Sequence, residues 1–162
     1  MDRMNVDESL ILRAAHISEA PAIASMSRLL VEHGLNWRWT PARVRHSIKD
    51  KETMVLVASV DGRLSGFAIM KFHDAESHLF LLAVAAKFQR TGIGHALLAW
   101  LEKSCQTAGM RHIRVEVRAN NHKARKFYER SGYRFIGQVA GYYDKREPAI
   151  VMVKTLADAL VK

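Results

Sequence analysis

Alternating apolar and polar positions along several short stretches of the chain predict β-strands. The clearest is HIRVEVR, residues 112–118, where apolar residues alternate with polar and charged ones. The stretches 54–60 and 64–72 flank Asp61-Gly62, a pair typical of a hairpin turn. The run from 78 to 86 is almost entirely apolar, so we expect a third strand of the same meander, buried on both faces.

Helical spacing and helix-end residues predict four helices between the strands. The first helix follows a short strand at 10–14, with Ser18 as its cap and Gly34 as its stop. Thr40 and Pro41 open the second helix, because threonine is a preferred cap and proline suits the first helical position.

The second half of the chain predicts two more helices with clear ends. Residues 92–108 carry one apolar stripe at helical spacing after Thr91, which we expect to cap this helix. The stripe consists of Ile93, Leu97, Leu101 and Cys105. The fourth helix is expected between Asn121 as its cap and Gly132 as its stop.

Two closing strands are expected over 133–139 and 149–154, joined across Gly141-Tyr142-Tyr143. The element order is then β-α-α-β-β-β-α-β-α-β-β, which predicts a mixed α/β (α+β) fold with one central sheet. The sequence shows no internal repeat, linker or shift in composition, so residues 1–162 are expected to form a single domain.

Composition and cysteine content indicate a globular protein of a reducing compartment. Of the 162 residues, 49% are hydrophobic and 25% are charged, as in ordinary soluble domains. The single cysteine, Cys105, cannot form an internal disulfide, and MDRMNVDESL lacks the pattern of a secretory signal. The longest apolar run is too short to cross a bilayer. We therefore expect a cytoplasmic protein without a membrane span.

The net charge of +9 favours acidic partners such as nucleotide phosphates, nucleic acid or the ribosome, although a solvated basic surface has the same composition. No helix-turn-helix, RNP or finger pattern is present, so direct DNA binding is not expected. None of the eight histidines forms a spaced pair with a cysteine or carboxylate, so no metal is expected.

Two glycines, Gly92 and Gly94, stand where the third helix should begin, although glycine inside a helix costs up to about 1 kcal/mol. Glycine lets backbone approach a ligand closely, and the start of a helix attracts anions. A P-loop is excluded because no G-x-x-x-x-G-K-[ST] run occurs. A dinucleotide-binding fingerprint fits poorly, because Leu97 stands where its third glycine would be.

Gln89-x-x-Gly92-x-Gly94 after an apolar strand resembles the coenzyme A pyrophosphate loop of the GNAT family of N-acetyltransferases, Q/R-x-x-G-x-G/A. VEVR at 115–118, followed by Asn121-x-x-Ala124-x-x-Phe127-Tyr128, resembles the second motif of that family. The resemblance implies a mixed sheet of about seven strands flanked by about four helices, with acetyl-CoA as co-substrate.

Within the family, the chain looks most like the bacterial ribosomal-protein-alanine N-acetyltransferases. The resemblance rests on the glycine segment, on VEVR and on the late Gly141-Tyr142-Tyr143. Two positions depart from their pattern, because Ala86 replaces the usual proline and Pro148 replaces a common acidic residue.

The resemblance also implies which residues bind the coenzyme: a strand end that pairs with the pantetheine arm, the pyrophosphate loop and one side of the fourth helix. These residues are Leu82, Ala83, Val84, Gln89, Arg90, Thr91, Gly92, Ile93, Gly94, His95, Asn121, Ala124 and Tyr128.

Two catalytic residues are implied by the same comparison. Tyr128 would be the general acid for the departing thiolate, since a phenol still carries its proton at neutral pH. Glu116 would be the base, acting through a water. The alternative for Glu116 stays open, because Arg114-x-Glu116-x-Arg118 is also typical of a solvated, ion-paired strand face.

Trp37, Tyr142 and Tyr143 are expected to line the acceptor site, although aromatic residues of the core or of a strand edge would show the same pattern.

An α-amine with a pKa near 8 needs far less help to lose its proton than a lysine near 10.4. We therefore expect direct attack on the thioester, in a ternary complex, by the α-amine at the N-terminus of a ribosomal or other protein. There are two alternatives. The protein could acetylate a small amine such as a polyamine, amino acid or drug, or it could be a non-catalytic module that binds acyl-CoA. The protein is expected to be a monomer or homodimer.

Overall fold

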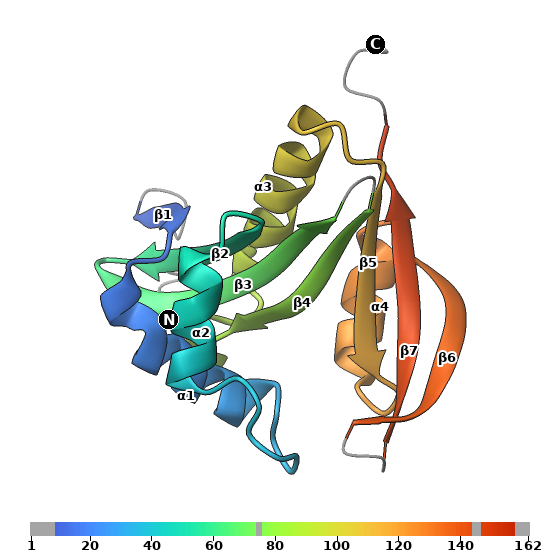
Figure 1. Cartoon of the computed structure of the whole chain (residues 1–162), viewed down its shortest axis with the longest axis horizontal. Helices are drawn as coiled ribbons and strands as arrows, with labels where there is room; N and C mark the ends of the chain where they lie inside the picture. Colours follow the sequence, from blue (N-terminus) through green and yellow to red (C-terminus); the bar gives the residue numbers. More distant parts are fainter. Residues whose placement is uncertain (1–8, 74–75, 144–146, 158–162) are drawn as a thin grey trace.

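A computed structural model describes residues 9–73, 76–143 and 147–157 (Figure 1). They form one seven-stranded sheet with the order β1-β2-β3-β4-β5-β7-β6. The strands are β1 (Leu10–Ala14), β2 (Thr53–Val60), β3 (Arg63–His73), β4 (Glu76–Val84), β5 (His112–Arg118), β6 (Arg134–Tyr143) and β7 (Glu147–Thr155). The helices are α1 (Ala20–Leu30), α2 (Pro41–Lys49), α3 (Ile93–Thr107) and α4 (His122–Arg130), with short 3-10 helices η2 (Ile17–Glu19) and η3 (Ala86–Phe88). The predicted mixed α/β fold and its element order are confirmed.

Helices cover both faces of the sheet. On one face, α1 and α2 pack on an apolar cluster that includes Ile23, Val44, Val57, Phe67 and Leu81. On the other face, α3 and α4 pack on a second cluster that includes Leu56, Met70, Leu97, Leu101 and Tyr128. Each helix buries one apolar stripe, as its spacing predicts. The sheet therefore separates the α1–α2 layer from the α3–α4 layer.

The sheet divides in its middle, between β4 and β5. These two strands are parallel and pair only over Glu76–Leu79 and His112–Val115, after which they diverge (Figure 1). At this point β4 contains a bulge, because Leu79 and Leu81 pair with consecutive residues of β3 and Phe80 is the extra residue. The bulge changes which face of the sheet the following residues occupy, and it lies where the two strands separate.

The prediction that the third strand is buried on both faces is wrong. Along β4, buried residues alternate with half-buried ones, and Phe80, Leu82 and Val84 belong to the half-buried set. The physical reason is the divergence of β4 from β5, which leaves these side chains beside an opening in the sheet.

The start of the first helix also differs from the prediction. Ser18 does not cap it; η2 precedes α1, and the Glu19 carboxylate accepts the N–H of His16 at 2.8 Å. α1 ends at Leu30, and Gly34, with φ of 78°, lies in the turn that follows. The Glu19 carboxylate, and not the Ser18 hydroxyl, thus accepts the free N–H of His16 at the start of this turn.

Gly141-Tyr142-Tyr143 is the end of β6 and not the connection that the sequence predicted. The strand continues past Val139 through a shift in register, and Tyr143 pairs with Glu147 of β7. A bulge that takes up the extra residues explains why the alternating pattern fades before the strand ends.

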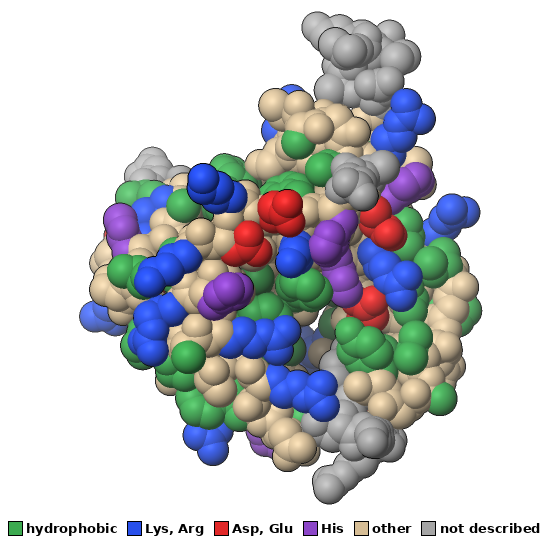
Figure 2. Space-filling view, viewed as in Figure 1, with side chains coloured by type: hydrophobic (Ala, Val, Ile, Leu, Met, Phe, Trp, Pro, Cys, Tyr) green, Lys and Arg blue, Asp and Glu red, His purple; other side chains and the backbone are tan. Residues whose placement is uncertain are grey.

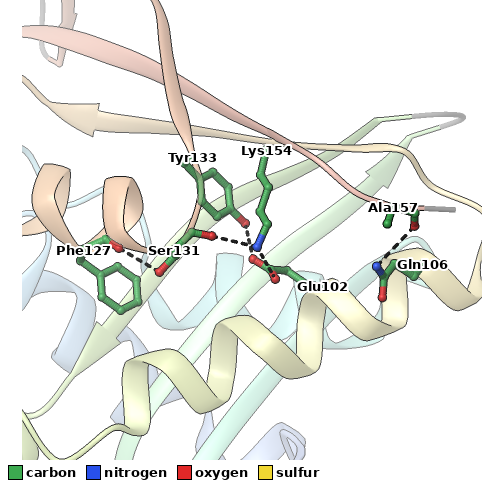
Figure 3. A network of polar contacts seen from close by, with 7 residues as sticks. All are labelled: Glu102, Gln106, Phe127, Ser131, Tyr133, Lys154 and Ala157. Atoms are coloured by element: carbon green, nitrogen blue, oxygen red, sulfur yellow. Dashed lines mark hydrogen bonds and ion pairs between the residues drawn. The ribbon is translucent and has the colours of Figure 1, made fainter. Parts of the chain in front are cut away.

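A polar network joins α3 to the C-terminal strands and to the end of α4 (Figure 3). Lys154 of β7 forms an ion pair with Glu102 of α3 at 3.0 Å and donates to the carbonyl of Ser131 at 2.8 Å. The Tyr133 hydroxyl donates to the same glutamate at 3.2 Å. The network links the two parts of the sheet on the α3–α4 face.

In the part of the chain that is described, no helix combines the length and the apolar character needed to cross a membrane.

Replacing Lys154 by methionine tests the network. Lys154→Met leaves the Glu102 carboxylate without its charged donor, so we expect the free energy of unfolding to fall by about 1–3 kcal/mol. Urea unfolding followed by circular dichroism measures it. Lys103→Met, on the exposed side of α3, is the matched control and should change stability little. Equal losses in both variants would contradict a role for the network.

Candidate active site

The opening between β4 and β5 leads into a cleft of about 320 Å³ on the α1–α2 face. Figure 2 shows the molecule hollowed between these two strands. Residues from the α1–α2 connection, α2, β4, β5 and β6 line the cleft: Val31, Glu32, Leu35, Asn36, Arg38, Trp39, Arg43, His78, Phe80, Leu81, Glu116 and Tyr142. The cleft is thus built by both parts of the divided sheet and by one connecting segment.

A buried carboxylate folds the α1–α2 connection. Glu32 is only 7% exposed, and its carboxylate accepts the N–H groups of Arg38 at 2.7 Å and Trp39 at 3.2 Å. The Ser27 hydroxyl donates to its other oxygen at 3.0 Å. Because a buried carboxylate is stable only when it is hydrogen-bonded, this segment keeps one conformation beside the cleft.

Arg118 of β5 ties the same segment to the C-terminal strands. Its guanidinium forms two hydrogen bonds to Glu147 of β7, at 2.7 and 2.8 Å, and donates to the carbonyl of His33 at 2.7 Å. A bidentate arginine–carboxylate pair has a fixed geometry. It therefore helps to fix the width of the cleft.

His78 and Glu116 meet where β4 and β5 begin to separate. The Nε2 atom of His78 is hydrogen-bonded to the Glu116 carboxylate, whose other oxygen accepts the Nε–H of Arg114 at 2.8 Å. The Glu116 side chain is 7% exposed, so it is not a solvated strand-face residue, although its ion pair with Arg114 is real. Arg118 pairs with Glu147 instead.

Burial acts to raise the pKa of Glu116, but the hydrogen bonds from His78 and Arg114 outweigh it, and that pKa lies below its usual value. Glu116 is therefore a carboxylate at neutral pH. A carboxylate of this kind is a weak base and a good acceptor that can orient a neighbouring imidazole.

Aromatic side chains line the rest of the cleft. The ring of Phe80 lies 4.4 Å from that of His78 and 5.8 Å from that of Trp39. Tyr142 lies on the β6 side, where burial, together with the charge of Glu116, raises its pKa. Of the three predicted acceptor-site residues, Tyr142 is thus in the cleft. The side chain of Tyr143 lies outside the described part of the chain.

Trp37 does not line the cleft. Its indole N–H donates to the carbonyl of Ala24 at 3.2 Å, so the ring packs on α1 below Arg28. Trp39, two residues later, occupies the cleft wall. The peptide bonds held by Glu32 decide which tryptophan faces the cleft.

The glycine segment opens α3 on the opposite face of the sheet. Arg90 and Gly92 both have left-handed backbones, with φ of 63° and 90°, and Gly92 is the cap position of α3. The predicted cap at Thr91 is wrong, because its hydroxyl donates instead to the carbonyl of Phe88. The left-handed turn explains the first glycine, since a side chain there would be strained.

Gly94 has a different reason. A Cβ atom at this position would lie 3.3 Å from Cε2 of Phe127 on α4, so glycine lets the first turn of α3 pack against that ring. The first helical hydrogen bond of α3 runs from Ala96 N–H to the Gly92 carbonyl at 3.0 Å. The N–H groups of Ile93, Gly94 and His95 precede it and have no helical acceptor. This end of α3 fits a phosphate group.

The other predicted coenzyme residues surround this loop. Gln89 donates to the Val84 carbonyl at 3.0 Å and so closes the loop onto the end of β4. Leu82 and Ala83 lie beyond the last β4–β5 pair, so their strand edge on that side faces the opening. Backbone groups on such an edge can pair with an extended ligand.

Asn121 and Tyr128 are placed by α4. The Asn121 side chain caps the helix by accepting the N–H of Ala124 at 3.1 Å, which confirms the predicted cap. Tyr128 is 6% exposed and lies edge-on to Phe127 and Tyr133, with ring centres 5.1 and 5.3 Å away.

Tyr128 and Glu116 lie on opposite faces of the sheet. Val115 and Val117 pack with Tyr128 in the α3–α4 layer, and Glu116 lies between them on the cleft side. The predicted acid and base are thus separated by the opening between the strands.

The described residues contain no group of three His, Cys, Asp or Glu side chains arranged to hold a metal ion. His78, Glu32 and Phe80 complete the cleft but were not among the predicted site residues. The sequence signal for His78 is its spacing of two residues from Phe80 in the same expected strand, which places both on one face.

The lowered pKa of Glu116 predicts a pH-dependent contribution to stability. An unfolded glutamate titrates near ~4.3, and the folded value is lower, so the carboxylate stabilises the fold above that pH. The contribution is lost as the pH falls through the folded pKa. We expect Glu116→Gln to lower the free energy of unfolding by about 1–3 kcal/mol at pH 7 and by much less at low pH. Urea unfolding at several pH values measures this, and a constant difference would contradict it.

Comparison with known proteins agrees with this architecture. Residues 24–156 match the family described as Acetyltransferase (GNAT) domain. The [Ribosomal protein bS18]-alanine N-acetyltransferase of Escherichia coli is 37% identical over 95 residues, which are 57% of this chain and 64% of that enzyme. The match thus spans just under two thirds of that relative, whereas an N-alpha-acetyltransferase of Sulfurisphaera tokodaii is 25% identical over 158 residues, 90% of this chain and 92% of that protein.

Solved structures show the same fold. The crystal structure of the E. coli enzyme superposes with a TM-score of 0.81 at 25% identity, covering 94% of this chain and 97% of that one. The PaiA N-acetyltransferase of Thermoplasma acidophilum, solved in complex with coenzyme A, gives a TM-score of 0.77 at 20% identity, covering 91% and 99%. The chain belongs to the GNAT family of N-acetyltransferases.

Proposed function

We propose that the protein transfers an acetyl group from acetyl-CoA to the α-amine of a protein N-terminus. One observation carries the proposal: where β4 and β5 separate, a cleft containing His78 and Glu116 lies on one face of the sheet, and the unpaired N–H groups that begin α3 lie on the other. The names of the E. coli and S. tokodaii relatives support an N-terminal acceptor.

Acetyl-CoA suits the α3–α4 face. The free N–H groups of Ile93, Gly94 and His95 would hold its pyrophosphate, with Arg90 and Thr91 beside them. The open edge of β4 would pair with its pantetheine arm, and Asn121 and Ala124 would lie along it. The coenzyme A bound to the T. acidophilum protein supports this choice of ligand. When bound, acetyl-CoA supplies the acetyl group as a thioester.

The acceptor amine would enter from the cleft and lose a proton to His78. Glu116 is ionised and hydrogen-bonded to His78, so it would orient the imidazole toward the amine. The amine nitrogen then forms the amide bond as the carbon–sulfur bond breaks. An α-amine near pKa 8 is neutral often enough for this base, whereas a lysine near 10.4 is not.

Tyr128 would return a proton to the departing sulfur on the other face. The hydroxyl of its neighbour Tyr133 is engaged by Glu102, and burial strongly raises the pKa of Tyr133. Tyr133 is therefore a poor candidate for this proton donor.

Tyr128→Phe tests the acid. We expect turnover to fall roughly 10²- to 10⁴-fold with acetyl-CoA affinity retained, because only the proton donor is lost. Thiol release with peptide substrates and acetyl-CoA binding by calorimetry measure the two quantities. Tyr133→Phe removes a hydroxyl from the neighbouring ring and is the matched control, expected to keep turnover. Full activity of Tyr128→Phe would remove the acid role.

His78→Gln tests the base. We expect kcat/KM to fall roughly 10²-fold or more, and the rise of rate with pH that an imidazole produces to be lost. His112→Gln, on the same side of the sheet but bonded to Thr155, is the control. If His78→Gln keeps the pH profile of the unaltered protein, then Glu116 or water takes the proton instead.

A small-amine acetyltransferase and a non-catalytic acyl-CoA-binding module are the other candidates. Thiol release with peptide N-termini compared with polyamines, amino acids and aminoglycosides separates them. Binding of acetyl-CoA without turnover of any acceptor would favour the module. The cytoplasmic location and the monomeric or dimeric state stay predictions from the sequence.

A further inference from the structure

We propose that the acceptor carries an acidic side chain close to its reactive amine, and that Arg43 recognises it. The proposal rests on the function proposed above, in which the cleft receives the acceptor. It assigns a substrate class to that cleft: N-termini with aspartate or glutamate at the second or third position.

Arg43 presents a cation to the cleft without a carboxylate partner. It lies in the first turn of α2, and its guanidinium carbon is 3.7 Å from the centre of the Trp39 ring. Among the described residues, no ion pair involves this guanidinium. Stacking on Trp39 fixes the plane of the guanidinium and leaves its N–H groups free for a ligand.

The two carboxylates of the cleft are already engaged. Glu32 accepts three hydrogen bonds from its own segment, and Glu116 is held by His78 and Arg114. Arg38 lines the same cleft and adds a second positive charge. The cleft therefore offers the Arg43 guanidinium to an incoming ligand, while the carboxylates of Glu32 and Glu116 are hydrogen-bonded.

The Arg43 guanidinium is accessible to an anionic ligand, because the residue is exposed. Partial burial lowers the pKa of Arg43; the charge of Glu32 acts in the opposite direction, and the smaller effect of Arg38 lowers the pKa further. A carboxylate can form two parallel hydrogen bonds with such a guanidinium and balance its charge.

The spacing of the side chains places the acidic residue. A series of contacts runs from Arg43 over Trp39 and Phe80 to His78, with centre separations of 3.7, 5.8 and 4.4 Å. An extended peptide advances ~3.3 Å per residue. With the α-amine at His78, the side chain of the second or third residue reaches the guanidinium. A lysine or arginine there would be repelled by Arg43 and Arg38.

Three otherwise identical peptides that begin with alanine test the proposal, with Glu, Gln or Lys at position 2, and a second set varies position 3. Coenzyme A release gives kcat/KM for each. We expect Glu to exceed Gln by roughly tenfold or more at one of the two positions, and Lys to be the poorest, as for a charge-assisted hydrogen bond.

Arg43→Gln should bring the Glu-to-Gln ratio close to one, and Arg43→Glu should turn the preference toward Lys. Arg45→Gln, an exposed arginine of the same helix outside the cleft, should keep the original ratio. The KM for acetyl-CoA, whose site lies on the other face, should be the same in the unaltered protein and in Arg43→Gln. Circular dichroism checks that each variant is folded.

Equal turnover of the Glu and Gln peptides by the unaltered protein would overturn this inference and leave the proposed function intact. A preference for Glu that survives Arg43→Gln would do the same. Preference for free aspartate or glutamate over every peptide would overturn the peptide assignment. Absence of turnover with any peptide would overturn the proposed function, and this inference with it.

Discussion

The short pairing of β4 with β5 is the constraint on which the rest of the structure depends. These strands share a ladder over only four residue pairs and then separate, while every other neighbouring pair in the described sheet is antiparallel. Their separation leaves the end of β4 without a strand partner on one side and places His78 beside Glu116 at the cleft. Backbone groups left unpaired inside a protein are costly unless water or a ligand satisfies them. The unpaired edge of β4 is therefore a place where a ligand can supply the missing hydrogen bonds.

A divided sheet needs other connections to keep its two parts in place, and polar ties on both faces supply them. On the α3–α4 face, Glu102 and Lys154 join a helix of the N-terminal part to a strand of the C-terminal part (Figure 3). On the cleft face, Arg118 joins β5 to Glu147 and to the carbonyl of His33. Because each tie is partly buried and involves several hydrogen bonds, the width of the opening is set before any ligand arrives.

Local patterns predicted much of the fold, and long-range pairing explains what they missed. Periodicity and helix-end residues predicted the element order and the Asn121 cap correctly, since these depend on neighbours within one or two turns. The contact between His78 and Glu116 joins residues 38 positions apart, which no local pattern contains. The predicted Thr91 cap is wrong because Gly92, with a left-handed backbone, is the cap position. The predicted place of Trp37 in the cleft is wrong because Glu32 binds the backbone N–H of Trp39, whose ring lines the cleft instead.

The connection between α1 and α2 owes its conformation to its own buried carboxylate, Glu32, and to one outside donor, Arg118. The coenzyme loop is on the other side of the sheet and shares neither of these contacts. Side chains of this segment that lie between its anchors can therefore change without disturbing the loop that begins α3. The α1–α2 side of the cleft and the start of α3 have separate supports, so selection can alter one while preserving the other.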